Sequence, residues 1–286
     1  MVNKVKTISF VGAGALAGAM ARLLRAHGYA ISEIISREEA ASKRKARTLA
    51  REVGAVATTL AKARLDCDLL WLAVPDGTIE SVAGDLARKL DDMDGRPLIT
   101  LHASGALSSE VLAAVAACGV ETGSAHPMMT FVAGEPPSLE GVWFAVEGTP
   151  KAVQAARALA RTLGARSFVI EPQSKALYHA FGAMLSPMLA TELEAAERIG
   201  LRAGIDAKQV RRIMEPIVLR TVRNVLRAGA GKSFSGPLAR GDVRTVERHL
   251  ESLEGMAEAG VYRALMEYAT EALPVKKIEE MRKLLR

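Results

Sequence analysis

The stretch that decides the fold is Thr7-Ile-Ser-Phe-Val-Gly-Ala-Gly-Ala-Leu-Ala-Gly18. An apolar strand runs into the pattern Gly-x-Gly-x-x-Ala, and an amphipathic helix follows with Met20, Leu23 and Leu24 on its apolar side. In such a turn the first glycine allows a sharp bend and the second admits a pyrophosphate close to the backbone, while the small third residue lets the helix pack on the strand. The helix N-terminus offers free N–H groups to phosphates. This context predicts a dinucleotide-binding turn formed by Gly12, Ala13, Gly14, Ala15 and Leu16, with Ala17 as the small third residue.

The end of the second predicted strand, residues 30–35, indicates which dinucleotide binds. Proteins that bind NAD place an acidic residue near this point for the ribose 2′-hydroxyl, whereas this strand runs into Ser36 and Arg37. A hydroxyl and a guanidinium suit a 2′-phosphate, so the pair favours NADP(H) over NAD(H). Alternatively, Ser36 followed by Glu38 and Glu39 simply caps the next helix, and both roles can hold together. The next helix brings further positive charge with Lys43, Arg44 and Lys45.

The composition is that of a globular protein with room for two domains. The 286 residues are 49% hydrophobic and 24% charged, and the formal net charge is +6. A positive charge invites a nucleic-acid partner, but acidic residues are interspersed among the basic ones and aromatic residues make up only 4%. A solvated surface and an anionic cofactor explain the charge better, and no nucleic-acid partner is expected.

The cysteines and the apolar runs exclude other classes. Cys67 and Cys118 have no metal-ligand spacing and are expected to be small buried residues, so no metal is predicted. The chain opens on a strand rather than on a charged leader with an apolar segment, and it contains no uncharged apolar run of about 18 residues. A cytoplasmic protein without a membrane partner is expected.

Strands and helices alternate over the first part of the chain, which predicts an α/β domain of Rossmann type over residues 1–170. Its strands are nearly continuous apolar runs, as in a mostly parallel sheet covered on both faces. Ligands of such sheets bind at the carboxyl ends of the strands. After the first two strands, we expect further strands at 68–75, 97–101, 121–125 and 142–146.

From residue 171 onward the pattern is helical, which predicts an all-α domain over residues 171–286. Pro187 and Pro216 fall inside helical patterns and are expected to kink or interrupt them. The expected helices are 173–204, 207–228, 242–258, 259–272 and 275–285.

Several strand ends carry residues that suit ligand contact. Backbone from Ala73, Val74 and Pro75 is expected to line the nicotinamide side of the cofactor, with Asp76 as a helix N-cap. After the next strand, Ser104 can donate a hydrogen bond to substrate and Gly105 leaves backbone open. Ser104 or Ser108 could instead cap the following helix.

Three further groups are candidates for chemistry. His126 stands at a strand end before Pro127 and can either orient a loop or reach substrate. Lys175 and His179 are one helical turn apart, so they point the same way and could bind a carboxylate or protonate the product. Asp242 is a natural N-cap, and the neighbouring Arg240 could clamp an anion or pair with it.

These motifs together resemble a bacterial family in which a Rossmann-like NADP-binding domain precedes a domain of unknown function called DUF2520. More distantly the chain resembles pyrroline-carboxylate reductases, deazaflavin-dependent NADP oxidoreductases, β-hydroxyacid dehydrogenases and ketopantoate reductases. The last two classes carry Lys-x-x-x-Asn on the long helix with lysine as the acid, and that pattern would map onto Lys175, with His179 in place of asparagine. The resemblance also implies a homodimer built from the helical domains. The motifs that carry it are Gly12-x-Gly14-x-x-Ala17, Ala73-Val-Pro-Asp76, His102-Ala-Ser-Gly-Ala-Leu107, His126-Pro-Met-Met-Thr-Phe131, Lys175-x-x-Tyr-His179 and Gly236-Pro-x-x-Arg-Gly-Asp242.

The function expected from the sequence is NADPH-dependent reduction of a small, anionic, carboxylate-bearing carbonyl or imine, such as a ketopantoate-like keto acid. The alternative is a non-catalytic NADP-binding sensor or scaffold. On the first hypothesis Lys175 supplies or orients the proton, and Ser104, His126 and His179 position the substrate.

Overall fold

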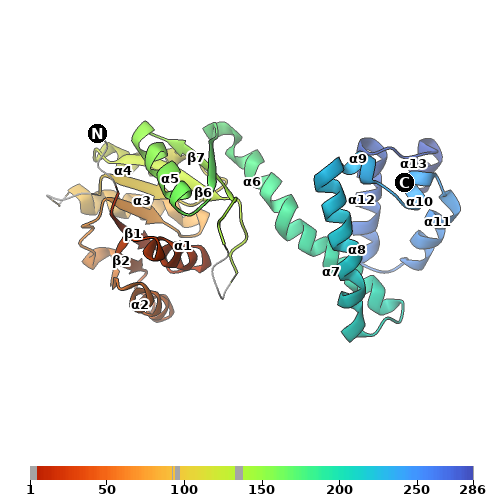
Figure 1. Ribbon diagram of the computed structural model, residues 1–286, viewed down its shortest axis with the longest axis horizontal. Helices are drawn as coiled ribbons and strands as arrows, with labels where there is room; N and C mark the ends of the chain where they lie inside the picture. The colour runs from red at the N-terminus through yellow and green to blue at the C-terminus, as the bar shows by residue number, and fades with distance from the viewer. Residues whose placement is uncertain (1–4, 92, 94–96, 133–137, 286) are drawn as a thin grey trace. The chain divides into compact units, whose positions relative to one another are not determined.

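The computed structural model describes residues 5–91, 93, 97–132 and 138–285 (Figure 1). Internal contacts divide the chain into two compact units, Met1–Ala183 and Met184–Arg286. The predicted boundary at residue 170 lies at the end of a strand, but the next helix still packs on the sheet, so the compact units divide later in the chain.

The first unit is built on an eight-stranded sheet in the order β3-β2-β1-β4-β5-β6-β7-β8. The strands β1 to β6 are mutually parallel, which confirms the predicted α/β, Rossmann-type sheet. Their carboxyl ends therefore meet along one edge of the sheet. The strands are β1 (Thr7–Val11), β2 (Ala30–Ser36), β3 (Val56–Thr59), β4 (Leu69–Leu72), β5 (Ile99–His102), β6 (Glu121–Pro127), β7 (Trp143–Gly148) and β8 (Arg166–Val169).

The last two strands depart from the parallel pattern. The strand β7 runs antiparallel to β6, with Ser124 directly opposite Glu147, and β8 then pairs parallel with β7. The sequence did not predict β8, because this edge strand is largely exposed and lacks a continuous apolar run.

Helices cover both faces of the sheet (Figure 1). Alternate residues of β4 point to opposite faces, so Leu69 and Trp71 enter one core and Leu70 and Leu72 the other. Trp71 stacks on Phe10 of β1 at 5.9 Å between ring centroids. The first core is closed by α1 (Ala15–Ala26), α2 (Ala40–Val53) and α5 (Pro150–Thr162), and the second by α3 (Asp76–Asp91), the 3₁₀ turn η2 (Ser109–Leu112) and α4 (Ala113–Ala117).

The first unit ends with α6 (Lys175–Ala183), which follows the 3₁₀ turn η3 (Pro172–Ser174). The sequence predicts a single helix over 173–204, whereas the structure places a π-helical turn at Met184–Met188, around Pro187. Proline lacks the N–H that an α-helix requires, and here the helix takes the rare π-helical form around it. Pro216 does not interrupt its helix, which is continuous over Ala207–Ala228.

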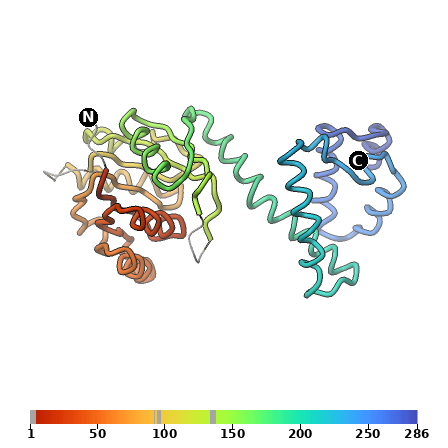
Figure 2. Tube along the Cα trace, in the orientation of Figure 1, coloured from red at the N-terminus to blue at the C-terminus, as the bar shows by residue number. Residues whose placement is uncertain are grey.

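The second unit is all-helical and can be followed along the tube in Figure 2. Its small core gathers Leu238, Val246, Met266, Met281 and Leu285. The predicted helix over 242–258 is shorter, because it stops at Ser252 before a turn. The helices are α7 (Leu189–Arg202), α8 (Ala207–Ala228), α9 (Ala230–Ser233), α10 (Pro237–Arg240), α11 (Val243–Ser252), α12 (Glu258–Ala272) and α13 (Ile278–Leu285).

Two findings concern the expectations about a membrane and about the cysteines. Among the described residues, none of the helices has the length and apolar character needed to cross a membrane. Cys67 is buried as expected, whereas Cys118 is only half-buried and its thiol faces the carbonyl oxygen of Ala87 and the carboxylate of Asp91.

Candidate functional site

In the glycine turn after β1, the structure explains why each of the three motif positions carries a small residue. Gly12 has φ +109°, and a Cβ there would overlap the carbonyl oxygen of Ala73. Gly14 is the N-cap of α1, and a Cβ at this position would meet nothing within 4 Å. Ala17 is fully buried in the contact of α1 with the sheet. The first and third positions are therefore small for packing, while the second leaves its backbone open toward a ligand.

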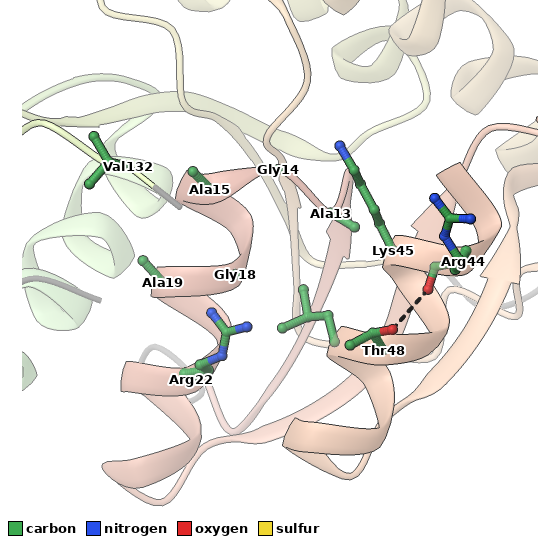
Figure 3. Close-up of a pocket in the computed structure, with 11 residues that line it drawn as sticks. Ala13, Gly14, Ala15, Gly18, Ala19, Arg22, Arg44, Lys45, Thr48 and Val132 are labelled. Carbon is green, nitrogen blue, oxygen red and sulfur yellow. Dashed lines mark hydrogen bonds between the residues drawn. The ribbon is translucent and has the colours of Figure 1, made fainter. Parts of the chain in front are cut away.

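A cavity of about 390 Å³ opens beside this turn (Figure 3). One wall is the start of α1, with Ala13, Gly14 and Ala15, and the other is α2, from which the side chains of Arg44 and Lys45 extend. Leu16 packs against the core instead of lining the cavity. Open glycine backbone, a helix N-terminus and two cations fit the phosphates of a dinucleotide.

The end of β2 carries the residues expected at the 2′-phosphate. The Ser36 hydroxyl donates to the carbonyl oxygens of Arg37 and Thr58, at 3.0 and 3.4 Å. The helix α2 starts after Glu39, so Ser36 does not cap it. The Arg37 side chain is 73% exposed and its Nε lies 3.2 Å from Glu39. Arg37 can therefore reach a ligand, while Ser36 must first give up its bonds to the backbone.

A second cavity, of about 190 Å³, lies beside Ser36. Its lining includes two basic side chains to which the sequence analysis gave no role, Arg47 and Lys62. Lys43 lines it as well and pairs with Glu38, and this contact is the main reason that the pKa of Glu38 is lowered. The i, i+4 spacing of Lys43 and Arg47 was the available signal, because it puts both on one face of α2.

The turn after β4 lies against the glycine turn. The Ala73 N–H donates to the Val11 carbonyl at 2.8 Å, which places Ala73, Val74 and Pro75 beside Gly12. The helix α3 begins at Asp76 itself, so Asp76 is its first residue and not its N-cap. Thr78 closes the turn, since its N–H and its hydroxyl both donate to the Pro75 carbonyl.

The loop after β5 is held by its own side chains. The Ser104 Oγ accepts from the N–H groups of Ala106 and Leu107, at 3.1 and 3.0 Å, and so forms a turn rather than a helix cap. Burial, and to a smaller extent the charge of Lys175, lowers the pKa of His102 to about 3. The neutral ring accepts from Ser104 N–H at Nδ1 and contacts the Ser108 carbonyl through Nε2 at 3.1 Å, which makes Nε2 the protonated nitrogen.

Gly105 of this loop meets two imidazoles. A Cβ at residue 105 would lie 2.8 Å from Cδ2 of His179 and 2.9 Å from Nε2 of His126. The two rings are 6.0 Å apart and nearly perpendicular. Three residues that the sequence singled out separately, Gly105, His126 and His179, thus converge at the carboxyl ends of β5 and β6.

His126 is bonded to a tyrosine that sequence reasoning had quoted but given no role. The Tyr178 hydroxyl lies 2.9 Å from Nδ1 of His126, with the rings perpendicular. Burial lowers the pKa of His126 to about 4, with smaller contributions from Lys175 and His179. Burial raises the pKa of Tyr178 to about 12, against a smaller lowering effect of a hydrogen bond from the Ala145 backbone. With the Tyr178 hydroxyl as the donor to Nδ1, the neutral His126 ring carries its proton on Nε2, the nitrogen that faces Gly105.

Lys175 lies deeper than the sequence suggested. Its side chain is fully buried, and its Nζ donates to the Ser104 carbonyl at 3.0 Å and to the Ser124 hydroxyl, and lies 3.7 Å from Glu147. Burial lowers the pKa of Lys175 to about 8, although Glu147 acts in the opposite direction. Lys175 and His179 do approach the same loop, Lys175 from within and His179 from the exposed side.

Glu147 and Ser124 are the residues of this network that sequence analysis missed. An acidic residue directly after the apolar run of β7 was the available signal, because a charge at the end of a buried strand requires a partner. In the second unit, Asp242 caps α11 as predicted by accepting from the Thr245 N–H and hydroxyl, and Arg240 is exposed.

Two family models match separate segments of the chain. Residues 7–103 match the family described as NADP oxidoreductase, coenzyme F420-dependent, and residues 142–269 match the domain of unknown function DUF2520. A comparison with curated proteins finds no match.

Solved structures share the fold over nearly the whole chain. A candidate NADP oxidoreductase from Bacteroides fragilis is 22% identical, with 95% of this chain and 100% of that one covered and a TM-score of 0.77. An imine reductase from Myxococcus stipitatus, solved with NADP⁺, is 15% identical, covers 98% and 100%, and has a TM-score of 0.69. A pyrroline-5-carboxylate reductase from Coxiella burnetii is 18% identical, covers 99% of each chain, and has a TM-score of 0.56. At these identities the likeness establishes the fold.

Proposed function

We propose that this chain, which joins a segment matching an NADP oxidoreductase family to a DUF2520 segment, is an NADP-dependent oxidoreductase that reduces the C=N or C=O bond of a small metabolite held against Gly105, His126 and His179. The observation that carries the proposal is the convergence of these three residues beside the strand ends that bear the dinucleotide turn. Ligands of parallel sheets bind at this edge.

The cofactor is NADP(H), which supplies the hydride. Its pyrophosphate would lie on Gly12, Ala13, Gly14 and Ala15 at the start of α1. Exposed Arg37 would take the 2′-phosphate, with Ser36 as a second donor after rotation of its hydroxyl. Backbone from Ala73 to Pro75 would line the path toward the nicotinamide, because this turn lies between the glycine turn and the loop that contains Ser104.

His126 is proposed to bind the reacting heteroatom. Its neutral ring presents Nε2–H toward Gly105, and the Tyr178 hydroxyl holds that tautomer. A neutral imidazole donates a hydrogen bond to a developing negative charge without being consumed as an acid. His179 is exposed and can exchange a proton with water, so it is the proposed route for proton delivery to the product.

In this proposal Ser104 and Lys175 support the loop and do not contact the substrate. The Ser104 hydroxyl already serves the turn and its carbonyl already binds Lys175. The ammonium of Lys175 faces three acceptors and no solvent, so it supports the loop instead of donating a proton to substrate. This differs from the role expected for Lys175 from the sequence.

The substrate is proposed to be an anionic, carboxylate-bearing imine or keto acid, in the class of pyrroline carboxylates and ketopantoate-like acids. The support is the shared fold with a pyrroline-5-carboxylate reductase and the net charge of +6.

The helical unit is proposed to form a homodimer. Ile213 and Ile217 lie one turn apart on α8 and are 53% and 67% exposed. Of the residues in α7, all of which the structure describes, none is buried, and α8 buries only Val210. Long helices with exposed apolar side chains indicate an interaction surface.

The test is NADPH oxidation by the purified protein with a panel of cyclic imines, imine carboxylates and α-keto acids. The proposal expects turnover with at least one class, and loss of turnover in Gly105→Ala with NADPH affinity retained, because the added methyl would collide with both imidazoles. NADPH binding without turnover on any compound would instead favour a sensor or scaffold.

A further inference from the structure

The loop Ser104–Ser109 is tied at both ends to one buried ion pair. At its start, the Ser104 carbonyl accepts from Nζ of Lys175 at 3.0 Å and from the Ser124 hydroxyl at 3.3 Å. At its end, the N–H and hydroxyl of Ser109 donate to the two carboxylate oxygens of Glu147, at 2.8 and 2.7 Å. The loop therefore spans two anchors that belong to α6 and β7, elements far from it in sequence.

The two anchors are coupled through their charges. Nζ of Lys175 lies 3.7 Å from Oε1 of Glu147, and the two side chains are 0% and 3% exposed. Ser124 lies directly opposite Glu147 across β6 and β7 and accepts from Lys175. Each charge satisfies groups of the loop as well as its partner, so removing either charge affects both ends.

The anchored loop controls the position of one critical residue. Gly105 follows Ser104 directly, and there is no room for a Cβ between it and the rings of His126 and His179. A displacement of a few tenths of an ångström at Ser104 would therefore change the separation between Gly105 and Nε2 of His126. Sites that bind a reacting atom need this separation to be fixed.

A buried ion pair is a poor device for stability alone. Removing two charges from water is costly, and well-packed apolar residues often stabilise a fold as well or better. Breaking one partner, in contrast, leaves an uncompensated buried charge. The hydrogen bonds from the loop to both charged groups point to another role for this ion pair, which is to hold the loop in place.

We infer that Glu147 and Lys175 are positioning residues, which hold the Ser104–Ser109 loop so that Gly105 stays in register with His126 and His179. They touch neither substrate nor cofactor in this assignment. The importance of the register for catalysis rests on the proposed function, whereas the anchoring itself does not.

The experiment compares Glu147→Gln with Glu121→Gln by amide hydrogen exchange and by NMR of the His126 ring nitrogens in the full-length protein. Glu121 is the matched control, because it lies on β6 and pairs with Lys151 of α5 at 2.8 Å, outside the loop network. In Glu147→Gln, exchange at Leu107 and Ser109 should accelerate by roughly tenfold or more, and the His126 resonances should shift, since the loop opens locally. Glu121→Gln should change neither readout.

The double variant Lys175→Met with Glu147→Gln separates positioning from stability. It removes both charges, so its thermal midpoint should recover relative to Glu147→Gln. The exchange at Leu107 and Ser109 should stay fast, because Ser104 has lost the ammonium of Lys175 and Ser109 keeps one uncharged acceptor in place of two carboxylate oxygens. The double variant also provides the readout if Glu147→Gln does not fold.

Two results would overturn the inference. One is wild-type exchange and wild-type His126 resonances in Glu147→Gln, and the other is a double variant in which both return to wild-type values together with stability. Once a turnover substrate is known, Glu147→Gln should lower kcat with little change in NADPH affinity. If no substrate is found the proposed function fails, but the exchange and NMR results still decide the anchoring.

Discussion

The hydroxyl of Tyr178 lies 2.9 Å from Nδ1 of His126, so the first helical turn after the sheet fixes the ring at the end of β6. The bond sets which nitrogen of His126 faces the exposed side of the loop. A tyrosine whose pKa is raised to about 12 and a histidine whose pKa is lowered to about 4 both stay neutral across the physiological range. When Nδ1 accepts from Tyr178, the donor that the neutral His126 ring offers to the candidate site is Nε2–H, which faces Gly105.

Tyr178→Phe should lower kcat by roughly tenfold to a hundredfold, because the His126 ring loses the bond that selects its tautomer. NADPH affinity should be unchanged. The matched control is Tyr262→Phe, which removes a similar bond of 2.7 Å to His249 in the second unit. Nitrogen NMR of His126 should report mixed tautomers in Tyr178→Phe alone. Unchanged kcat and a single His126 tautomer would contradict the assignment.

Gly12→Ala should lower the stability of the fold, whereas Gly14→Ala should lower the affinity for NADPH. Gly12 needs φ +109° and contacts the Ala73 carbonyl, so alanine there should cost about 1–3 kcal/mol of strain and lower the Tm. Gly14 has φ −76° and open space around it, so alanine should leave the Tm unchanged. It should nevertheless weaken NADPH binding by roughly tenfold or more, since the methyl group would occupy the approach of the pyrophosphate. Calorimetric melting and titration of both variants check this, and full NADPH affinity in Gly14→Ala would refute the placement.

Arg37→Ala should weaken NADPH binding roughly tenfold to a hundredfold, because a charge-assisted hydrogen bond contributes about 1.5–3 kcal/mol. NADH lacks the 2′-phosphate, so its affinity should stay the same. Glu39→Gln is a useful companion, since it frees Arg37 from the carboxylate 3.2 Å away and should tighten NADPH binding slightly. Equal losses for both cofactors in Arg37→Ala would place the 2′-phosphate elsewhere.

The fold should lose stability as the pH falls from 6.5 toward 4. The pKa values of His102 and His126 are lowered to about 3 and about 4, from an ordinary value of 6.5. Below pH 6.5 the unfolded chain therefore binds protons that the folded chain does not, and each histidine removes about 1.4 kcal/mol per pH unit. Urea unfolding over this range should show a falling midpoint, with a shallower fall in His126→Gln. If the unfolding midpoints of the wild type and of His126→Gln fall equally with pH, the lowered pKa of His126 is wrong.

Ile213→Lys with Ile217→Lys should shift the protein from dimer to monomer, because two charges would enter a buried apolar surface. Val56→Lys is the control, since Val56 is 62% exposed on the sheet unit and lies outside the proposed interface. Light scattering of the three proteins gives the oligomeric state. A monomeric wild-type protein would end the dimer proposal.

The sequence predicts those parts of this molecule that depend on local pattern. The glycine turn, the parallel strands and the positions of His102, Ser104 and His126 at strand ends follow from periodicity and from the spacing of small residues. The strand β7 follows from its apolar run as well, but its antiparallel direction and the edge strand β8 do not, because their pairing depends on tertiary contacts that no local signal encodes.

At the candidate site, too, local sequence pattern does not predict contacts between separate elements. Lysine is usually exposed, so the burial of Lys175 could not be inferred from its helix position. The pairing of Lys175 with Glu147, and of Tyr178 with His126, joins residues from separate elements whose distance is set only by the folded sheet. The sequence identified most of the residues at the site, but their roles depend on depth and partners.

The most direct test of the account is hydride transfer from NADPH in which both hydrogens at the nicotinamide C4 position are replaced by deuterium, with product analysed by mass spectrometry. With an imine or keto-acid substrate, the wild-type protein should yield product that contains one deuterium on the reduced carbon, and Gly105→Ala should yield none while still binding NADPH. Tight NADPH binding with no labelled product from any compound of either class would contradict the claim that this site is the centre of a reductase.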